Sequence, residues 1–129
     1  MSEKPSINGV EVGELLEFKN ICAQHPDKAD RNPALVAHWE GGSRSRVEFK
    51  GMTVHLGGDG EFNAMQMFLA TLAVCDVDLV AMHASFLGLK IESLSVEAAG
   101  HFNVRSYLGL DRAPGSGYDD ISYTVRISA

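Results

Sequence analysis

Residues 63–88, with the sequence NAMQMFLATLAVCDVDLVAMHASFLG, decide the fold. Asn63 is a favoured helix N-cap, and Gln66 stands three positions later, as in a capping box. Gly88 stands where a left-handed residue commonly ends a helix. Between these signals, apolar residues recur at spacings of three and four: Met65, Phe68, Leu69, Leu72, Cys75, Leu79, Met82 and Phe86. A helix that is apolar on most sides packs on more than one side, so we expect a long, buried central helix.

Charge and composition limit the class of protein. Asp76, Asp78 and His83 in the second half of this helix argue against a membrane span. The net charge is −6 and the basic residues form no long run, which disfavours nucleic acid and membrane as partners. The N-terminal stretch is polar and resembles no signal sequence. We therefore expect a cytoplasmic protein whose two cysteines, which lack CxxC or zinc spacing, are free thiols.

Shorter elements flank the central helix. Residues 12–23 form an amphipathic pattern that ends at His25-Pro26, and residues 27–33 are a charged connector. Alternating apolar and polar residues predict strands at 35–40, 46–50 and 52–56 before the helix, and at 91–99 and 121–128 after it. Glycines at 41–42 predict a hairpin turn, and those at 57–60 a loop into the helix. We expect residues 100–118 to form an extended segment followed by an irregular loop.

The order α-β-β-β-α-β-β predicts an α+β fold in which an antiparallel sheet packs on the central helix. The length favours one domain over residues 1–129, with a leader and N-terminal helix at 1–33 and a core at 34–129. So small a chain offers little to cover the other sides of the helix. We therefore expect a homodimer.

Several motifs, taken in order, carry a family resemblance. They are WEGGSR before the second strand, a glycine-rich loop, the helix start at 63–67, a cysteine after LATLAV, and the helix exit GLKIESLSVE. Together they resemble the OsmC/Ohr family of osmotically inducible and organic hydroperoxide resistance proteins. INGVEVGELLE, GHFNVRSYLGLD and GYDDISYTVRI resemble one OsmC-like branch, so that the resemblance covers residues 7–128. It implies an intertwined homodimer that reduces hydroperoxides with a cysteine thiol.

The residues implied by the resemblance carry over only in part. Cys75 matches the attacking cysteine, and Arg44 is the best match for the family's arginine, with Arg46 next. The position of the family's glutamate, ten residues before the cysteine, holds Met65 here. The resolving cysteine belongs to a helix beyond the last strand, and this sequence ends at Ala129, before that helix. The resemblance thus implies a C-terminally short form that needs an external thiol reductant.

Two functions remain open. One is a thiol peroxidase that uses Cys75, with a pocket at the dimer interface that favours organic hydroperoxides. The other is a catalytically weakened member of the family that binds a small apolar ligand in the same pocket. The pocket residues that we expect are Phe68, Leu72, Met82 and Phe86. The missing glutamate and resolving cysteine favour the second function, whereas Cys75 together with an arginine favours the first.

The cysteines also have simpler interpretations. A lone cysteine on an apolar helix is often only a small hydrophobic residue. Asp76 and Asp78 stand beside Cys75, and negative neighbours raise the pKa of a thiol. Cys22 fits a core position on the N-terminal helix better than it fits a substitute resolving thiol.

Metal and phosphate sites have little support. His38 and His55 fall on the polar faces of two neighbouring strands, but no third ligand stands at metal spacing, so we predict no metal and no cofactor. The glycine-rich loop at 57–60 lacks the Lys-Ser/Thr ending of a phosphate loop. We expect this loop to be a flexible rim of the active site.

Overall fold

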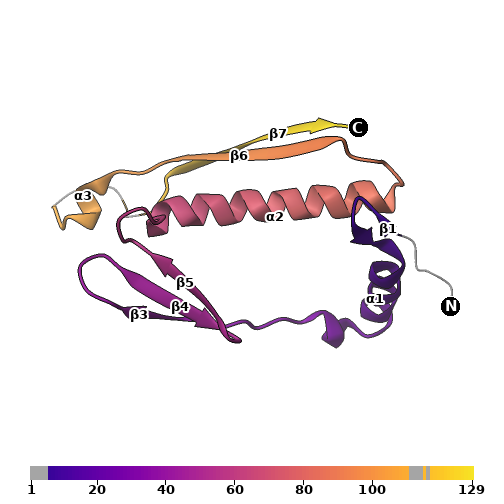
Figure 1. Ribbon diagram of the computed structural model, residues 1–129, viewed down its shortest axis with the longest axis horizontal. Helices are drawn as coiled ribbons and strands as arrows, with labels where there is room; N and C mark the ends of the chain where they lie inside the picture. The colour runs from indigo at the N-terminus through magenta and orange to yellow at the C-terminus, as the bar shows by residue number, and fades with distance from the viewer. Residues whose placement is uncertain (1–5, 111–114, 116) are drawn as a thin grey trace. The chain divides into compact units, whose positions relative to one another are not determined.

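The computed structural model describes residues 6–110, 115 and 117–129 (Figure 1). The chain divides into two compact units, one ending at Phe68 and the other beginning at Leu69. Both units combine helix with antiparallel strands, which confirms the α+β class.

The first unit begins with a small hairpin that the sequence interpretation, a polar leader, missed. Strands β1 (Ser6–Ile7) and β2 (Val10–Glu11) pair across Asn8 and Gly9. Both turn residues have positive φ, 56° and 75°, as a tight type I′ turn requires, and Asn-Gly is the pair that favours it. The Asn-Gly pair was therefore a usable signal.

The predicted N-terminal helix is confirmed. Helix α1 spans Val12–Gln24, and its N-terminal residue, Val12, is buried. The expected connector after it contains one turn of 3₁₀ helix, η1 (Pro26–Ala29), which begins at a proline. Proline suits this position because the first helical residue needs no N–H group.

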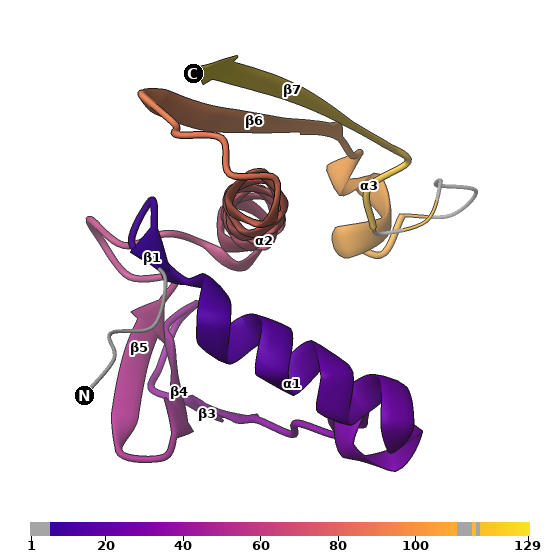
Figure 2. The ribbon, with the colours of Figure 1, turned by 90° about the vertical axis from the view of Figure 1, so that its right-hand side faces the viewer.

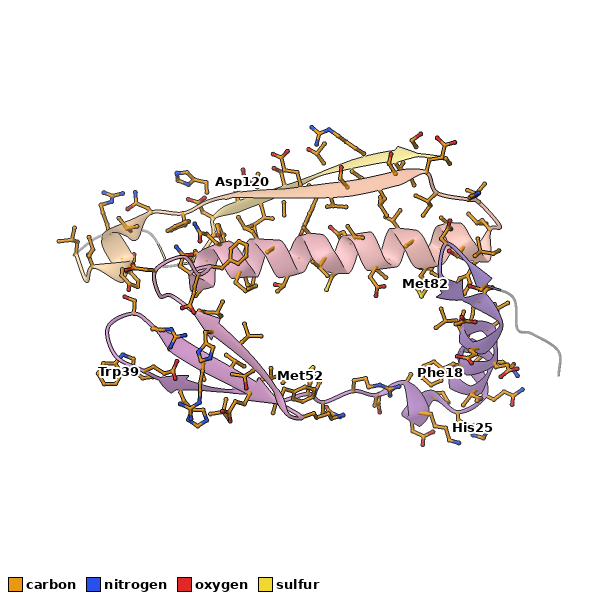
Figure 3. The ribbon with its side chains drawn as sticks, in the orientation of Figure 1. Phe18, His25, Trp39, Met52, Met82 and Asp120 are labelled. Atoms are coloured by element: carbon orange, nitrogen blue, oxygen red, sulfur yellow. The ribbon has the colours of Figure 1, made fainter. Side chains whose placement is uncertain are left out.

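Three predicted strands form an antiparallel sheet in the order β3-β4-β5: β3 (Val36–Trp39), β4 (Ser45–Phe49) and β5 (Met52–Leu56). Their register gives the sheet one polar and one apolar face. The apolar face carries Ala37, Trp39, Val47, Phe49, Met52, Val54 and Leu56. Trp39, labelled in Figure 3, is 75% exposed, so this face is not covered by a tight core.

The register corrects the interpretation of the two strand histidines. His38 pairs with Arg46, and Arg46 pairs with His55 on its other side. The histidines thus lie on the two outer strands, not on neighbouring ones, with a cationic residue between them. Throughout the described ranges, no group of three His, Cys, Asp or Glu side chains could hold a metal ion.

The central helix begins and ends as predicted. Helix α2 spans Ala64–Phe86. Asn63 Oδ1 accepts the N–H of Gln66 at 2.8 Å, and Gln66 Oε1 accepts the N–H of Asn63 at 3.1 Å, which completes the capping box. At the other end Gly88 has φ 75°, and the N–H of Leu89 donates to the carbonyl of Ala84 at 2.9 Å. This is a Schellman ending, which needs a residue with positive φ at Gly88.

Most of α2 is not buried within the single chain, and its expected burial in a homodimer stays a prediction. Only Ala84 and Ser85 of this helix are buried, and Val74 is 66% exposed. The cause is the small amount of structure beside it: in the second unit a two-stranded ribbon, β6 (Ser93–His101) and β7 (Asp120–Ser128), runs along the helix (Figures 1 and 2). By length and composition α2 would also suffice to cross a membrane, a property that core helices of soluble proteins share.

The ribbon confirms the last two predicted strands, and β6 is shifted slightly toward the C-terminus. Its register runs from Ser93 opposite Ser128 to His101 opposite Asp120. One face carries Leu94, Val96, Ala98, Ile121, Tyr123, Val125 and Ile127. Between the strands lies a short helix that was not predicted, α3 (Val104–Tyr107), with Asn103 accepting the N–H of Arg105 at 2.9 Å. The rest of the predicted irregular loop lies partly outside the described residues, at 111–114 and 116.

Candidate functional site

Arg44 is placed by the glycine turn that precedes it. Gly41 and Gly42 have φ values of 101° and 53°, in the region that favours glycine. The N–H of Arg44 donates to the carbonyl of Gly41 at 3.0 Å, and the N–H of Glu40 donates to the carbonyl of Arg44 at 2.9 Å. The turn therefore brings Glu40 and Arg44 side by side at one end of the β3–β4–β5 sheet.

A second segment of the same unit supplies a carboxylate to this arginine. Arg44 Nε donates to Glu61 Oε1 and Arg44 Nη2 donates to Glu61 Oε2, both at 3.0 Å. The N–H of Gly58 donates to Glu61 Oε1 at 2.9 Å. Parallel paired bonds between a guanidinium and a carboxylate fix direction as well as distance. Glu61 thus holds Arg44 in one orientation and is itself held by the backbone.

The loop that carries Glu61 approaches the glycine turn closely. A Cβ on Gly57 would collide with the carbonyl oxygen of Ser43, and Gly57 has φ 90°. A Cβ on Gly58 would meet the Glu61 carboxylate and lie 3.1 Å from Arg44 Cδ. These glycines therefore permit close packing of two backbone segments, a role that the expected flexible rim did not include.

Arg44 and Glu61 belong to a cluster of charged and polar side chains that also contains Glu40, Arg46 and His55. Glu40 is the second acceptor in this cluster. Its Oε1 accepts Arg44 Nη1 at 3.1 Å and lies 2.9 Å from His55 Nδ1. Its Oε2 lies 3.6 Å from Arg46 Nη1. Arg46 in turn donates through Nε to Glu48 at 2.9 Å. Arg46, the second choice from the sequence, thus belongs to the same cluster, but its own partner Glu48 is 53% exposed, whereas Glu61 beside Arg44 is 24% exposed.

These contacts shift the pKa values of the carboxyl groups. The hydrogen bonds from Arg44 lower the pKa of Glu61, with a further contribution from the Gly58 N–H and against the effect of partial burial. The same bonds raise the pKa of Arg44. Partial burial favours a higher pKa for Glu40, but its contact with His55 and the charges of Arg44 and Arg46 outweigh this and lower it. Both carboxyl groups are therefore ionised at neutral pH.

The two cysteines lie in different units, and both are free thiols. Cys75 lies on α2 in the second unit and is exposed, whereas Cys22 lies on α1 and is half-buried. An exposed thiol is open to small reactants and to a thiol reductant. The expected approach of Arg44 to the sulfur of Cys75 stays a prediction.

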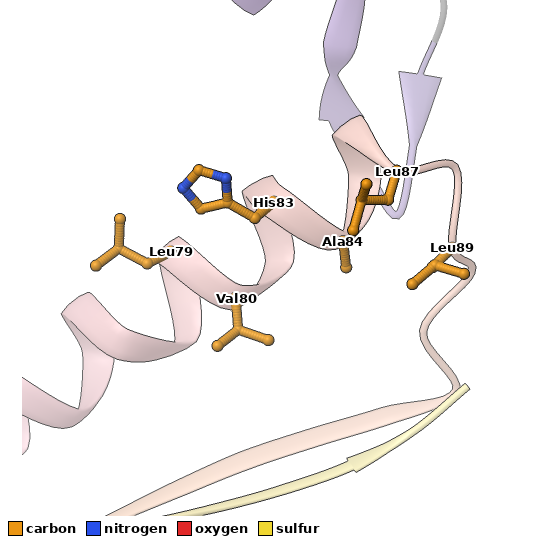
Figure 4. A pocket seen from close by; sticks show the side chains of 6 residues that line it. All are labelled: Leu79, Val80, His83, Ala84, Leu87 and Leu89. Atoms are coloured by element: carbon orange, nitrogen blue, oxygen red, sulfur yellow. The ribbon is translucent and has the colours of Figure 1, made fainter.

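The second unit contains an apolar hollow of about 350 Å³ (Figure 4). It is lined by Leu79, Val80, His83, Ala84, Leu87 and Leu89. The His83 ring packs edge-on against Phe86, with ring centroids 5.9 Å apart. The pocket residues expected from the sequence are not among the lining: Phe68 is exposed, and the other three, Leu72, Met82 and Phe86, are half-buried.

The sequence interpretation missed three residues of the cluster, Glu40, His55 and Glu61. The conclusion that the arginine lacks a glutamate is wrong, because Glu61, fourteen positions before Cys75, pairs with Arg44. The available signal was the position of Glu61 at the end of the glycine-rich loop. Comparison with protein-family models finds no match, and comparison with curated proteins finds none either.

Proposed function

We propose that this protein is an OsmC-like thiol peroxidase that reduces organic hydroperoxides through Cys75, with Arg44 as its cation and an external thiol as reductant. The observation that carries the proposal is the arginine of the WEGGSR motif, held by paired hydrogen bonds to Glu61. An arginine fixed in this way is organised before substrate arrives, which is the property that electrostatic catalysis needs.

The proposed reaction has two stages. The Cys75 thiolate attacks one peroxide oxygen, so that an S–O bond forms, the O–O bond breaks, and the alkoxide that leaves takes up a proton to give the alcohol. The sulfur loses two electrons and becomes a sulfenic acid. One external thiol then displaces water to give a mixed disulfide, and a second thiol releases Cys75 and the oxidised reductant. The exposure of Cys75 supports access by such a reductant.

Arg44 has a defined role in this scheme. Negative charge develops on the leaving oxygen, and a guanidinium that donates hydrogen bonds to it lowers the barrier. The guanidinium is always protonated in proteins, and Glu61 contributes by holding it in one orientation. The scheme requires Arg44 and Cys75 to act on the same peroxide, and the experiment below tests that requirement.

We also propose that the chain acts as a cytoplasmic homodimer. Among apolar residues in the described part of the chain, only Val12 and Ala84 are buried. Large apolar side chains of both units are exposed, for example Trp39, Val74 and Val125. Exposed apolar surface on this scale is typical of a protein that binds a partner. Sedimentation that finds a stable, folded monomer at micromolar concentration would contradict the dimer.

The apolar hollow supports a second candidate function, the binding of a small apolar ligand by a protein without peroxidase activity. Its volume of about 350 Å³ lies at the lower end of the range of small-molecule sites.

A coupled assay with cumene hydroperoxide and a dithiol separates the two functions. We expect wild type and Cys22→Ser to reduce the hydroperoxide, whereas Cys75→Ser should give only the background rate. In Arg44→Met we expect kcat to fall about 10²–10³-fold. Mass spectrometry should find the oxidised sulfur at Cys75. If wild type and Cys75→Ser give equal rates and Cys75 stays a thiol under excess peroxide, the ligand-binding function takes the place of the enzyme.

A further inference from the structure

Arg44 is held from two sides, and this determines which of its hydrogen atoms remain for a ligand. A guanidinium carries five N–H groups. Glu61 accepts one from Nε and one from Nη2, and Glu40 accepts one from Nη1. Two N–H groups remain, one on each terminal nitrogen, and within the described part of the chain no further acceptor of Arg44 is found.

We propose that Glu40 is a second positioning residue of the arginine site, which with Glu61 fixes the guanidinium so that its two remaining N–H groups face the reacting oxygen. This inference rests on the proposed role of Arg44 in peroxide reduction. Glu61 alone binds one edge of the guanidinium and leaves the opposite nitrogen, Nη1, unsupported. The bond from Nη1 to Glu40 restrains that nitrogen as well.

Glu40 is built into the structure more firmly than a surface carboxylate. Its backbone N–H donates to the carbonyl of Arg44, so the two residues are joined through the main chain as well as the side chains. His55 Nδ1 lies 2.9 Å from the same oxygen that accepts Arg44, and Arg46 approaches the other oxygen. Fixing a catalytic group through such supporting contacts is what limits its misplacement, and misplacement by about 1 Å can cost about 10²-fold in rate.

The chain offers a matched control for this role. Glu48 lies on the same sheet, but its partner is Arg46 and not Arg44. Glu40→Gln and Glu48→Gln thus make the same chemical change, but only the first removes charge from a partner of Arg44.

The experiment measures each full-length variant in two ways. The first is NMR of the arginine side chains, with the Arg44 signals assigned through Arg44→Lys. In Glu40→Gln we expect hydrogen exchange of the Arg44 Nη protons to rise about tenfold, because a charge-assisted hydrogen bond is replaced by a weaker neutral one. The second is steady-state kinetics, in which we expect kcat to fall about tenfold while the KM for the hydroperoxide stays unchanged. Glu48→Gln should match wild type in both.

The outcomes separate this inference from the proposed function. Equal exchange at Arg44 in Glu40→Gln and Glu48→Gln would overturn the positioning role, whatever the kinetics. A wild-type protein without peroxidase activity would overturn the proposed function, while the exchange rates would still decide whether Glu40 holds Arg44. If Glu40→Gln fails to fold by circular dichroism, His55→Phe replaces it, because it keeps a ring but removes the nitrogen that contacts Glu40, without changing either carboxylate. Faster exchange at Arg44 in that variant supports the role, and unchanged exchange overturns it.

Discussion

The two ends of the β3–β4–β5 sheet, marked by Trp39 and Met52 in Figure 3, are built in different ways. At the Met52 end, Lys50 and Gly51 join β4 to β5 in two residues, and the Lys50 ammonium lies 5.3 Å from the centroid of the Phe49 ring. At the Trp39 end, Arg44 depends on Glu61, which is 17 residues away in the chain. One end is thus formed by neighbouring residues, and the other by two segments that must meet.

The glycines at the two ends show what this difference requires. Gly51 and Gly57 both have positive φ, 79° and 90°. A Cβ on Gly51 would enter open space, whereas one on Gly57 would collide with the backbone of Ser43. A glycine at the local turn serves conformation alone, whereas a glycine at the site also makes room for a second segment.

Replacing these glycines should give the largest difference between the two ends. We expect Gly57→Ala to lower the free energy of unfolding by about 2–4 kcal/mol, because strain from positive φ adds to a backbone collision. Gly51→Ala should cost only about 1–2 kcal/mol, the strain alone. Urea unfolding of both variants measures the difference. Equal losses would mean that the close approach at Ser43 contributes nothing to stability.

Glu61→Gln should damage the site without disturbing the other end of the sheet. The amide keeps the size of the carboxylate but removes its charge, so Arg44 loses its paired ionic bonds. We expect kcat/KM for cumene hydroperoxide to fall about 10–100-fold, as for a misplaced catalytic group. A variant that retains the wild-type rate would show that Arg44 needs no carboxylate.

Acid should weaken the Trp39 end in particular. Glu40 and Glu61 have folded-state pKa values below the ordinary 4.5, so each stabilises the folded state fully above that pH. Their contribution is lost as the pH falls through the lowered folded-state pKa, where the folded protein takes up the protons. We therefore expect the urea midpoint of wild type to fall more steeply below pH 4.5 than that of Glu61→Gln. Parallel profiles for the two proteins would contradict the role of the Arg44–Glu61 pair.

The smallest effect should come from Lys50→Asn at the Met52 end. Lys50 has φ 48°, which is unfavourable for lysine but tolerated by asparagine, and Asn-Gly is the preferred pair in such turns. We expect a gain of about 0.5 kcal/mol in unfolding free energy, reduced by the loss of the contact with Phe49. Peroxidase activity should not change. A thermal melt together with the coupled assay is sufficient to check both.

What could be predicted from the sequence follows the same division between local and distant contacts. The capping box at Asn63, the ending at Gly88 and the three hairpin strands depend on residues close together, and the structure confirms them. The partner of Arg44 could not be found in this way, because Glu61 reaches it only after the loop at Gly57 folds back on Ser43.

The burial of α2 likewise depends on more than its own sequence pattern. The apolar pattern shows which side chains avoid water, but whether they are covered depends on what else packs there. The second unit supplies a two-stranded ribbon, and Ala84 and Ser85 are the residues of α2 that become buried.

Trp39 gives the protein an optical probe at the site end of the sheet. It is the single tryptophan of the sequence, and its indole N–H donates to the carbonyl of Gly42 at 2.8 Å, in the turn that places Arg44. All tryptophan fluorescence therefore arises beside this turn. Because the ring is 75% exposed, its emission should resemble that of indole in water and be quenched readily by acrylamide. Anything that covers the ring should shift the emission to shorter wavelength and slow the quenching, so that assembly at this face can be followed without a label.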